Sequence, residues 1–184
     1  MRKIVVSEGI SLDGVFDAQT MGQWAHPFFS EERDDFVRQT ILDTDALLYG
    51  RTTYDLEAYF WPNQKKNEYG FADRMNSLPK YVVTSRPLQA SWNNSTVIKE
   101  NILDEIDQLK RQPGKDILIK GSATLIRALL SAGLIDELKF MVHPVIAGSG
   151  KRFFTEGMDM TKLNLVESKP ISRGVVILTY QPTK

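Results

Sequence analysis

The sequence has no cysteine among its 184 residues. This absence excludes disulfides, a thiolate nucleophile, iron–sulfur clusters and cysteine-ligated zinc. Histidine is almost as scarce, because His26 and His143 are the two in the chain and a three-histidine zinc centre needs one more. We therefore expect no metal site.

The sequence also lacks an excess of charge of either sign. Its 23 Lys plus Arg balance 23 Asp plus Glu, whereas a nucleic-acid-binding domain usually carries a basic excess. No apolar run approaches the ~20 residues of a membrane span, and the N-terminal run at 4–6 is shorter than the ~7–15 residues of a secretory signal. These absences predict a cytoplasmic protein that binds neither nucleic acid nor membrane.

Hydrophobic patterning predicts an α/β fold in one domain spanning residues 1–184, a length that suits a single domain. Short apolar or β-branched runs predict strands at 4–6, 46–49, 81–84, 96–98 and 117–119, with helical segments between them. The last part of the chain is rich in strands instead, at 137–146, 162–168 and 174–181. This order predicts a largely parallel sheet with an antiparallel edge built from the last strands.

Capping residues delimit the predicted helices. Ser30 and Asn101 are placed to begin helices, and Gly133 is placed to end one. A short helix is predicted at 68–75, and residues 9–29 are predicted to form a long irregular loop, which is often functional.

Two strand-to-helix turns are of the type that binds phosphate. They read Tyr49-Gly50-Arg51-Thr52-Thr53 and Ile119-Lys120-Gly121-Ser122-Ala123-Thr124. In each, a glycine beside a cation precedes a helix start, where unpaired N–H groups and a partial positive charge favour an anion. Any strand–helix connection needs a tight turn and a cap, so one such turn alone indicates little. Two of them at strand carboxyl ends favour a nucleotide.

A third predicted strand ends at the same edge in Thr84-Ser85-Arg86. Two hydroxyls and a guanidinium suit a phosphate monoester such as the 2′-phosphate of NADPH. A solvated loop arginine is the alternative interpretation.

Two carboxylates are candidates for contact with a substrate. Asp13, in the block Ser11-Leu12-Asp13-Gly14, follows the first strand, and Glu32 lies one helical turn before Phe36. An Asp before Gly is more often a turn residue, and a Glu early in a helix is more often on the surface. The sequence leaves both interpretations open.

Five blocks, in this order, resemble a known family. They are Ser11-Leu12-Asp13-Gly14, 48–54, 81–86, 120–122, and 133–138 followed by 143–151. They are similar to the C-terminal reductase domain of the bifunctional riboflavin-biosynthesis deaminase/reductase, which has the dihydrofolate reductase fold. The family's usual Gly-Gly pair is Gly121-Ser122 here, and because the sequence has no cysteine we expect no zinc deaminase domain.

The resemblance implies an eight-stranded sheet, parallel except for its C-terminal strand, with helices on both faces and NADPH bound across the strand carboxyl ends. By position, the cofactor-binding residues it implies are Gly14, Gly50, Arg51, Thr52, Thr53, Thr84, Ser85, Arg86, Lys120, Gly121, Ser122, Ala123 and Thr124. The first turn would hold phosphates, 84–86 the 2′-phosphate and 121–124 the pyrophosphate. Asp13 and Gly14 would border the nicotinamide and the substrate.

The function that follows is NADPH-dependent reduction of a small heterocycle or a ribosylamino-pyrimidine. A non-catalytic nucleotide-binding module and a dihydrofolate or pterin reductase are the alternatives. Asp13, Glu32 or a bound water would deliver the proton, and Asp13 is expected to matter more than Glu32. The family also implies a homodimer, for which the strand at 137–146 with apolar Met141 offers an edge or a face.

Overall fold

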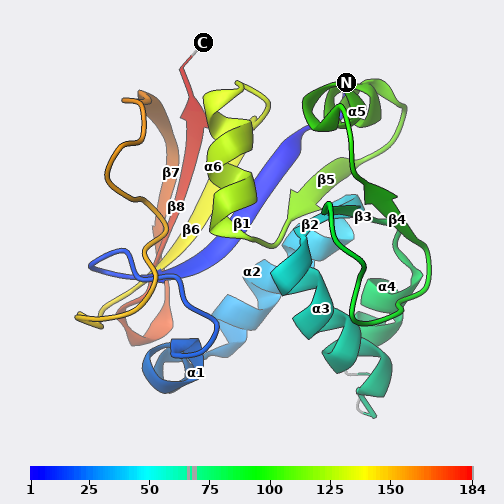
Figure 1. Ribbon diagram of the computed structural model, residues 1–184. Coiled ribbons are helices and arrows are strands. Elements are labelled where there is room, and N and C mark those ends of the chain that lie inside the picture. Colours follow the sequence, from blue (N-terminus) through cyan, green and yellow to red (C-terminus); the bar gives the residue numbers. More distant parts are fainter. Residues whose placement is uncertain (66, 68–69, 184) are drawn as a thin grey trace.

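The computed structural model describes residues 1–65, 67 and 70–183. One eight-stranded sheet, of order β4-β3-β2-β5-β1-β6-β8-β7, runs through the molecule (Figure 1). Its strands are β1 Ile4–Ser11, β2 Thr44–Gly50, β3 Lys80–Val83, β4 Ser95–Ile98, β5 Asp116–Ile119, β6 Glu137–His143, β7 Leu163–Pro170 and β8 Val176–Pro182. Neighbours from β4 to β6 are parallel, and β8 is antiparallel to both β6 and β7. The predicted mostly parallel sheet with its antiparallel C-terminal strand is confirmed.

Helices cover both faces of the sheet (Figure 1). They are α1 Met21–Trp24, α2 Glu31–Leu42, α3 Arg51–Phe60, α4 Phe71–Ser77, α5 Ile102–Arg111 and α6 Ala123–Ser131. Side chains of α5 and α6 pack on one face, and side chains of α2, α3 and α4 pack on the other. No helix in the described part of the chain is long and apolar enough to cross a bilayer.

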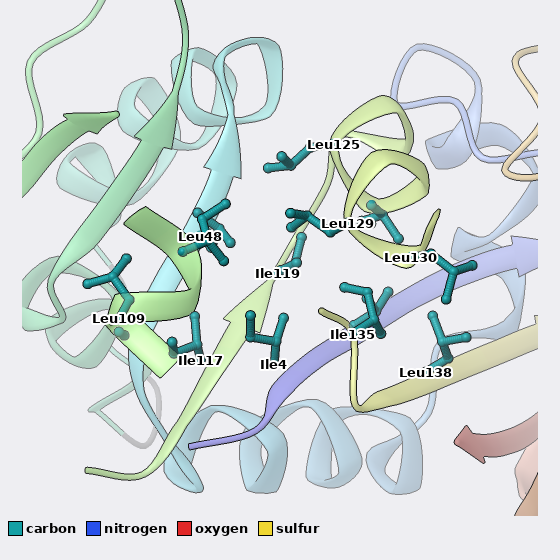
Figure 2. Close-up of a cluster of buried hydrophobic side chains, with 14 of the residues drawn as sticks. Ile4, Leu48, Leu109, Ile117, Ile119, Leu125, Leu129, Leu130, Ile135 and Leu138 are labelled. Atoms are coloured by element: carbon teal, nitrogen blue, oxygen red, sulfur yellow. The ribbon is translucent and has the colours of Figure 1, made fainter. Parts of the chain in front are cut away.

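The central strands bury both of their faces. On β5, Ile117 and Ile119 join the core beneath α5 and α6, which Figure 2 shows, while Leu118 points into the opposite core. On β2, Leu48 faces the first core and Tyr49 the second. Because successive side chains of a strand alternate between faces, a strand covered on both sides reads as a continuous apolar run.

The predicted helix caps are confirmed in part. The Ser30 hydroxyl accepts a hydrogen bond from the backbone N–H of Arg33 at 3.3 Å, and Gly133 follows α6 with φ of +69°. Asn101 occupies the N-cap position of α5, but its φ is +47° and its side chain makes no capping hydrogen bond with a described residue. The sequence therefore predicted the start of α5 correctly, but the prediction that the Asn101 side chain caps the helix was wrong.

Three other expectations need correction. The predicted loop at 9–29 is shorter, because β1 continues to Ser11 and α1 and a 3-10 turn, His26–Phe28, lie within it. The helix predicted at 68–75 is α4, Phe71–Ser77, and residues 68 and 69 lie outside the described residues. The strand at 137–146 offers no edge, because β6 lies between β1 and β8 and Met141 is buried. The surface on which the homodimer prediction depended is therefore not available for pairing, and the homodimer stays a prediction from the resemblance alone.

Candidate active site

The carboxyl ends of β3, β2 and β5 lie side by side in the sheet, in that order. The register pairs Gly50 with Val83, and the backbone N–H of Gly50 donates to the carbonyl of Gly121 at 3.0 Å. The three segments that the sequence singled out, 50–53, 84–86 and 120–124, therefore meet along one edge. Open parallel sheets bind their ligands at this edge.

Two glycines allow the turns after β2 and β5 to touch. A Cβ on Gly50 would lie 2.5 Å from Oγ of Ser122, and a Cβ on Gly121 would lie 2.8 Å from Oγ1 of Thr53. Gly121 also has φ of +88°, and the peptide between it and Ser122 is cis. Glycine at both positions is thus required by packing between the turns, whether or not a phosphate lies above them.

The helices that begin at these turns differ from their neighbours in charge. The first turns of α3 and α6 contain no acidic residue, whereas α2 begins with Glu31 and Glu32 and α5 with Asp104 and Glu105. At α3, Gly50 provides no capping side chain. The positive end of α3 is therefore not neutralised by the described residues, which is the condition that favours an anion.

The turn after β3 presents a cation to solvent. Thr84 is buried, and its hydroxyl accepts from the backbone N–H of Arg86 and donates to the Arg86 carbonyl, both at 3.0 Å. Ser85 and Arg86 are exposed beyond this turn. The nearby Arg51 pairs with Asp55 at 3.3 Å. Of the cations predicted to bind phosphate, Arg86 is the one held out at the surface of this edge.

A cavity of about 520 Å³ adjoins the same edge. Its apolar lining includes Phe16, Met21 and Val37, and its polar lining includes Glu8, Glu57, Lys120 and Thr53. Thr53 lies in the first turn of α3, so the cavity and the candidate phosphate site share a residue. The volume is within the range of small-molecule sites, ~300–1,000 Å³.

A polar cluster forms one wall of the cavity. Lys120 pairs with Oε1 of Glu57 at 2.8 Å, and Oε2 of Glu57 accepts from the Tyr49 hydroxyl at 2.7 Å and from Nε1 of Trp61 at 3.1 Å. Burial, followed by the charge of Glu57, raises the pKa of Tyr49 well above its ordinary value. The Lys120 ammonium thus pairs with Glu57 on the cavity side, which argues against its predicted contact with a phosphate.

Glu8 is an acidic residue of the cavity lining that the sequence analysis missed. It is 8% exposed, and burial raises the pKa of its carboxyl well above 4.5, with Glu57 adding to the rise and Lys120 opposing it. The first strand was predicted to end at Val6 because Ser7-Glu8-Gly9 interrupts the apolar run. The sequence signal that could have identified Glu8 is an acidic residue that closely follows the apolar run of the first strand.

Asp13 is engaged by its own chain. Its carboxylate accepts from the backbone N–H groups of Ala147 and Gly148, both at 3.0 Å, and from the Ser11 hydroxyl at 2.6 Å. These hydrogen bonds, the Ser11 bond first, lower the pKa of Asp13 to about 2. A group that stays ionised at neutral pH is a poor proton donor, so the geometry favours a role in holding the loop at 147–148. Its predicted effect on turnover stays a prediction.

Glu32 lies away from the cavity wall described above. Its carboxylate accepts from the backbone N–H of Ser172 at 2.6 Å and from the Ser172 hydroxyl, and these bonds lower its pKa. It joins the start of α2 to the turn between β7 and β8. This contact argues against the predicted catalytic role.

The sequence also matches a known domain family over nearly its whole length. Residues 2–177 match the model of the RibD C-terminal domain. The chain belongs to the RibD C-terminal domain family. This membership places it among riboflavin-pathway reductase domains and therefore among oxidoreductases.

Two relatives of this chain have similar lengths. The uncharacterized protein YyaP of Bacillus subtilis is 33% identical over 186 residues, covering 97% of this chain and 94% of YyaP. YwjB of the same organism is 29% identical over 175 residues, covering 95% of each chain.

Solved structures show the same fold. A putative riboflavin biosynthesis protein from Shewanella superposes with a TM-score of 0.78 at 23% identity and full coverage of both chains. Acinetobacter baumannii RibD gives 0.66 at 18% identity, with all of this chain matching 58% of that one. Dihydrofolate reductase from Enterococcus faecalis, complexed with NADP(H), gives 0.62 at 15% identity, covering 99% of this chain and 97% of that one. The dihydrofolate reductase-like fold implied by the sequence is confirmed.

Proposed function

We propose that this protein is an NADPH-dependent reductase of a small heterocyclic or ribosylamino-pyrimidine substrate, with a reaction like that of 5-amino-6-(5-phosphoribosylamino)uracil reductase. The observation that carries the proposal is the cavity of about 520 Å³ that shares Thr53 with the phosphate-type turn after β2. A reductase needs such adjacency, because the substrate must lie against one end of a cofactor whose phosphates are held elsewhere.

The residues present fit NADPH. The start of α3 has neither an acidic residue nor a side-chain cap from the described residues, which suits an anionic group. Arg86 and Ser85, exposed beyond β3, are placed for an additional phosphate monoester. The α3 N-terminus and the turn at 121–124 would hold the pyrophosphate.

When bound, NADPH supplies a hydride, and the protein supplies orientation and electrostatics. Phe16, Met21 and Val37 provide an apolar wall that excludes water from a planar substrate. The Lys120–Glu57 pair, fixed by Tyr49, gives that wall a rigid polar end.

The cavity favours an enzyme over a non-catalytic nucleotide-binding module, because a module of that kind has no need of a formed pocket beside its phosphate site. The pterin alternative depended on Glu32 and Phe36 lining the cleft. Since Glu32 binds Ser172 instead, the pyrimidine substrate is preferred.

Cofactor binding tests the proposal first. We expect NADPH to bind more tightly than NADH, and Arg86→Ala to remove roughly 10–150-fold of the NADPH affinity while leaving NADH binding unchanged. Arg111→Ala is the matched control, because Arg111 lies at the end of α5 and pairs with Asp107. Equal affinities for NADPH and NADH in the wild-type protein would contradict the 2′-phosphate assignment.

Turnover tests the substrate class. NADPH oxidation is followed with 5-amino-6-(5-phosphoribosylamino)uracil and with dihydrofolate. We expect oxidation with the pyrimidine. Tight NADPH binding without oxidation of either compound would favour the binding module.

A further inference from the structure

Glu8 lies where the sheet opens around the cavity. On β1, Val6 is the last residue paired with β5, through Ile119, whereas pairing with β6 continues past Glu8 to Ser11. The β5 side of β1 therefore loses its neighbouring strand just before Glu8. This geometry leaves the Glu8 side chain buried yet part of the cavity lining.

The charged groups that line the cavity with Glu8 already have partners, because Arg33 pairs with Asp34 at 2.6 Å and the others pair with one another. Lys120 pairs with Glu57, and Glu57 also accepts from Tyr49 and Trp61. Oε1 of Glu8 is buried without a hydrogen-bond partner among the described residues. A carboxyl group buried without a cation of its own keeps its proton, because the charged form is poorly solvated. Burial and Glu57 raise the Glu8 pKa, and Lys120 offsets only part of that rise.

We propose that Glu8 is the general acid of the reductase, holding a proton in the cavity and delivering it to the substrate as the substrate is reduced. This inference rests on the proposed function. Reduction of a C=N or C=O bond adds a hydride to carbon and a proton to the nitrogen or oxygen. Glu8 gives that proton from its carboxyl O–H, becomes a carboxylate, and is reprotonated by water that enters through the cavity opening.

The other acids near the site are less suited to this step. Hydrogen bonds lower the pKa of Asp13 and of Glu32, so both are ionised at neutral pH. The Tyr49 hydroxyl already donates a hydrogen bond to Glu57. The His143 ring packs against Trp24 at 5.5 Å, and burial lowers its pKa, so it carries no extra proton at neutral pH.

Infrared difference spectroscopy tests the proton on Glu8 without substrate or cofactor. Spectra of wild type minus Glu8→Gln are recorded across pH, with Glu156→Gln, an exposed glutamate, as control. We expect the protonated-carboxyl band in the Glu8 difference to persist to higher pH than the band in the Glu156 control, because burial raises the Glu8 pKa. Loss of both bands over the same pH range would overturn the proposal.

Single-turnover reduction of the pyrimidine tests delivery of the proton. We expect Glu8→Gln to bind NADPH with wild-type affinity, to slow reduction by ~10²–10⁴-fold with little change in KM, and to lose the alkaline limb of the pH–rate profile. Wild-type rates with an unchanged profile would overturn the role of Glu8. Failure of the wild-type protein to bind NADPH or to reduce either compound would overturn the proposed function, and the infrared measurement would still report whether Glu8 holds a proton.

Discussion

Two ionisable side chains, Lys80 on β3 and Glu8 on β1, are buried in the same sheet under opposite conditions. Lys80 is completely buried, and its ammonium donates to the carbonyls of Asn76 and Leu78 at 2.8 Å and of Asn93 at 3.1 Å. It also lies 4.3 Å from the centre of the Trp92 ring. Glu8 has a buried oxygen with no partner among the described residues.

The two side chains differ in how completely their polar atoms are hydrogen-bonded, and this difference indicates different roles. Burial lowers the pKa of Lys80 to about 8, but three acceptors match its three N–H donors, so the charge is stabilised where it lies. Glu8 borders a cavity and lacks that compensation. A buried ionisable group with complete partners organises the fold, whereas one with an unused hydrogen-bonding atom beside a cavity is a candidate for chemistry.

Removal of the Lys80 ammonium group is expected to have the largest effect on stability. We expect Lys80→Met to lower the free energy of unfolding by about 3–5 kcal/mol, because the carbonyls of Asn76, Leu78 and Asn93 lose their donor. Urea denaturation measures the change, with exposed Lys99→Met as control. Equal stability of the two variants would show that the carbonyls find other donors.

The pH dependence of stability tests whether burial of Glu8 favours its protonated form. The Glu8 pKa is raised in the folded protein, so its contribution to stability is complete below about 4.5 and is lost as pH rises through the folded value. Relative to Glu8→Gln, the wild type should lose stability above about pH 4.5, by at most ~1.4 kcal/mol per pH unit. A parallel dependence in both proteins would place Glu8 among ordinary glutamates.

Asp13 should show the opposite pH dependence. Its pKa is lowered to about 2, so its carboxylate stabilises the fold above pH 3.8, and the contribution is lost as pH falls toward 2. The stability difference between wild type and Asp13→Asn should therefore shrink in acid. Acid titration followed by circular dichroism measures it, and a difference that grows below pH 3.8 would contradict the hydrogen-bonding arrangement.

Turnover of the carboxylate variants gives the smallest expected change. Asp13→Asn and Glu32→Gln should each reduce kcat/KM by far less than the ~10²–10⁴-fold that removal of a general acid produces. Asp13→Asn should have the larger effect, because its carboxylate binds the loop at 147–148 to the segment that leads to Phe16, which lines the cavity. A large loss in Glu32→Gln alone would restore the pterin-type assignment.

Sequence patterns were sufficient for the fold because they report local periodicity and turns. The doubly buried run at 117–119 and the glycine turns at Gly50 and Gly121 placed the carboxyl edge correctly. These local patterns do not report contacts between segments that are distant in the sequence. Asp13 binds backbone groups 134 and 135 residues away, and the first strand, predicted to end at Val6, continues through the polar residue Glu8 to Ser11.

The contact between the two glycine turns also limits how this protein can change. With serine at 122, a methyl group at position 50 would meet both Oγ and Cβ of that serine, at 2.5 and 3.2 Å. Replacing Ser122 with glycine removes both atoms, although the backbone nitrogen, 3.1 Å away, stays close. Evolutionary variation at position 50 is thus conditional on the residue at 122, and libraries built for altered cofactor preference should randomise these two positions together.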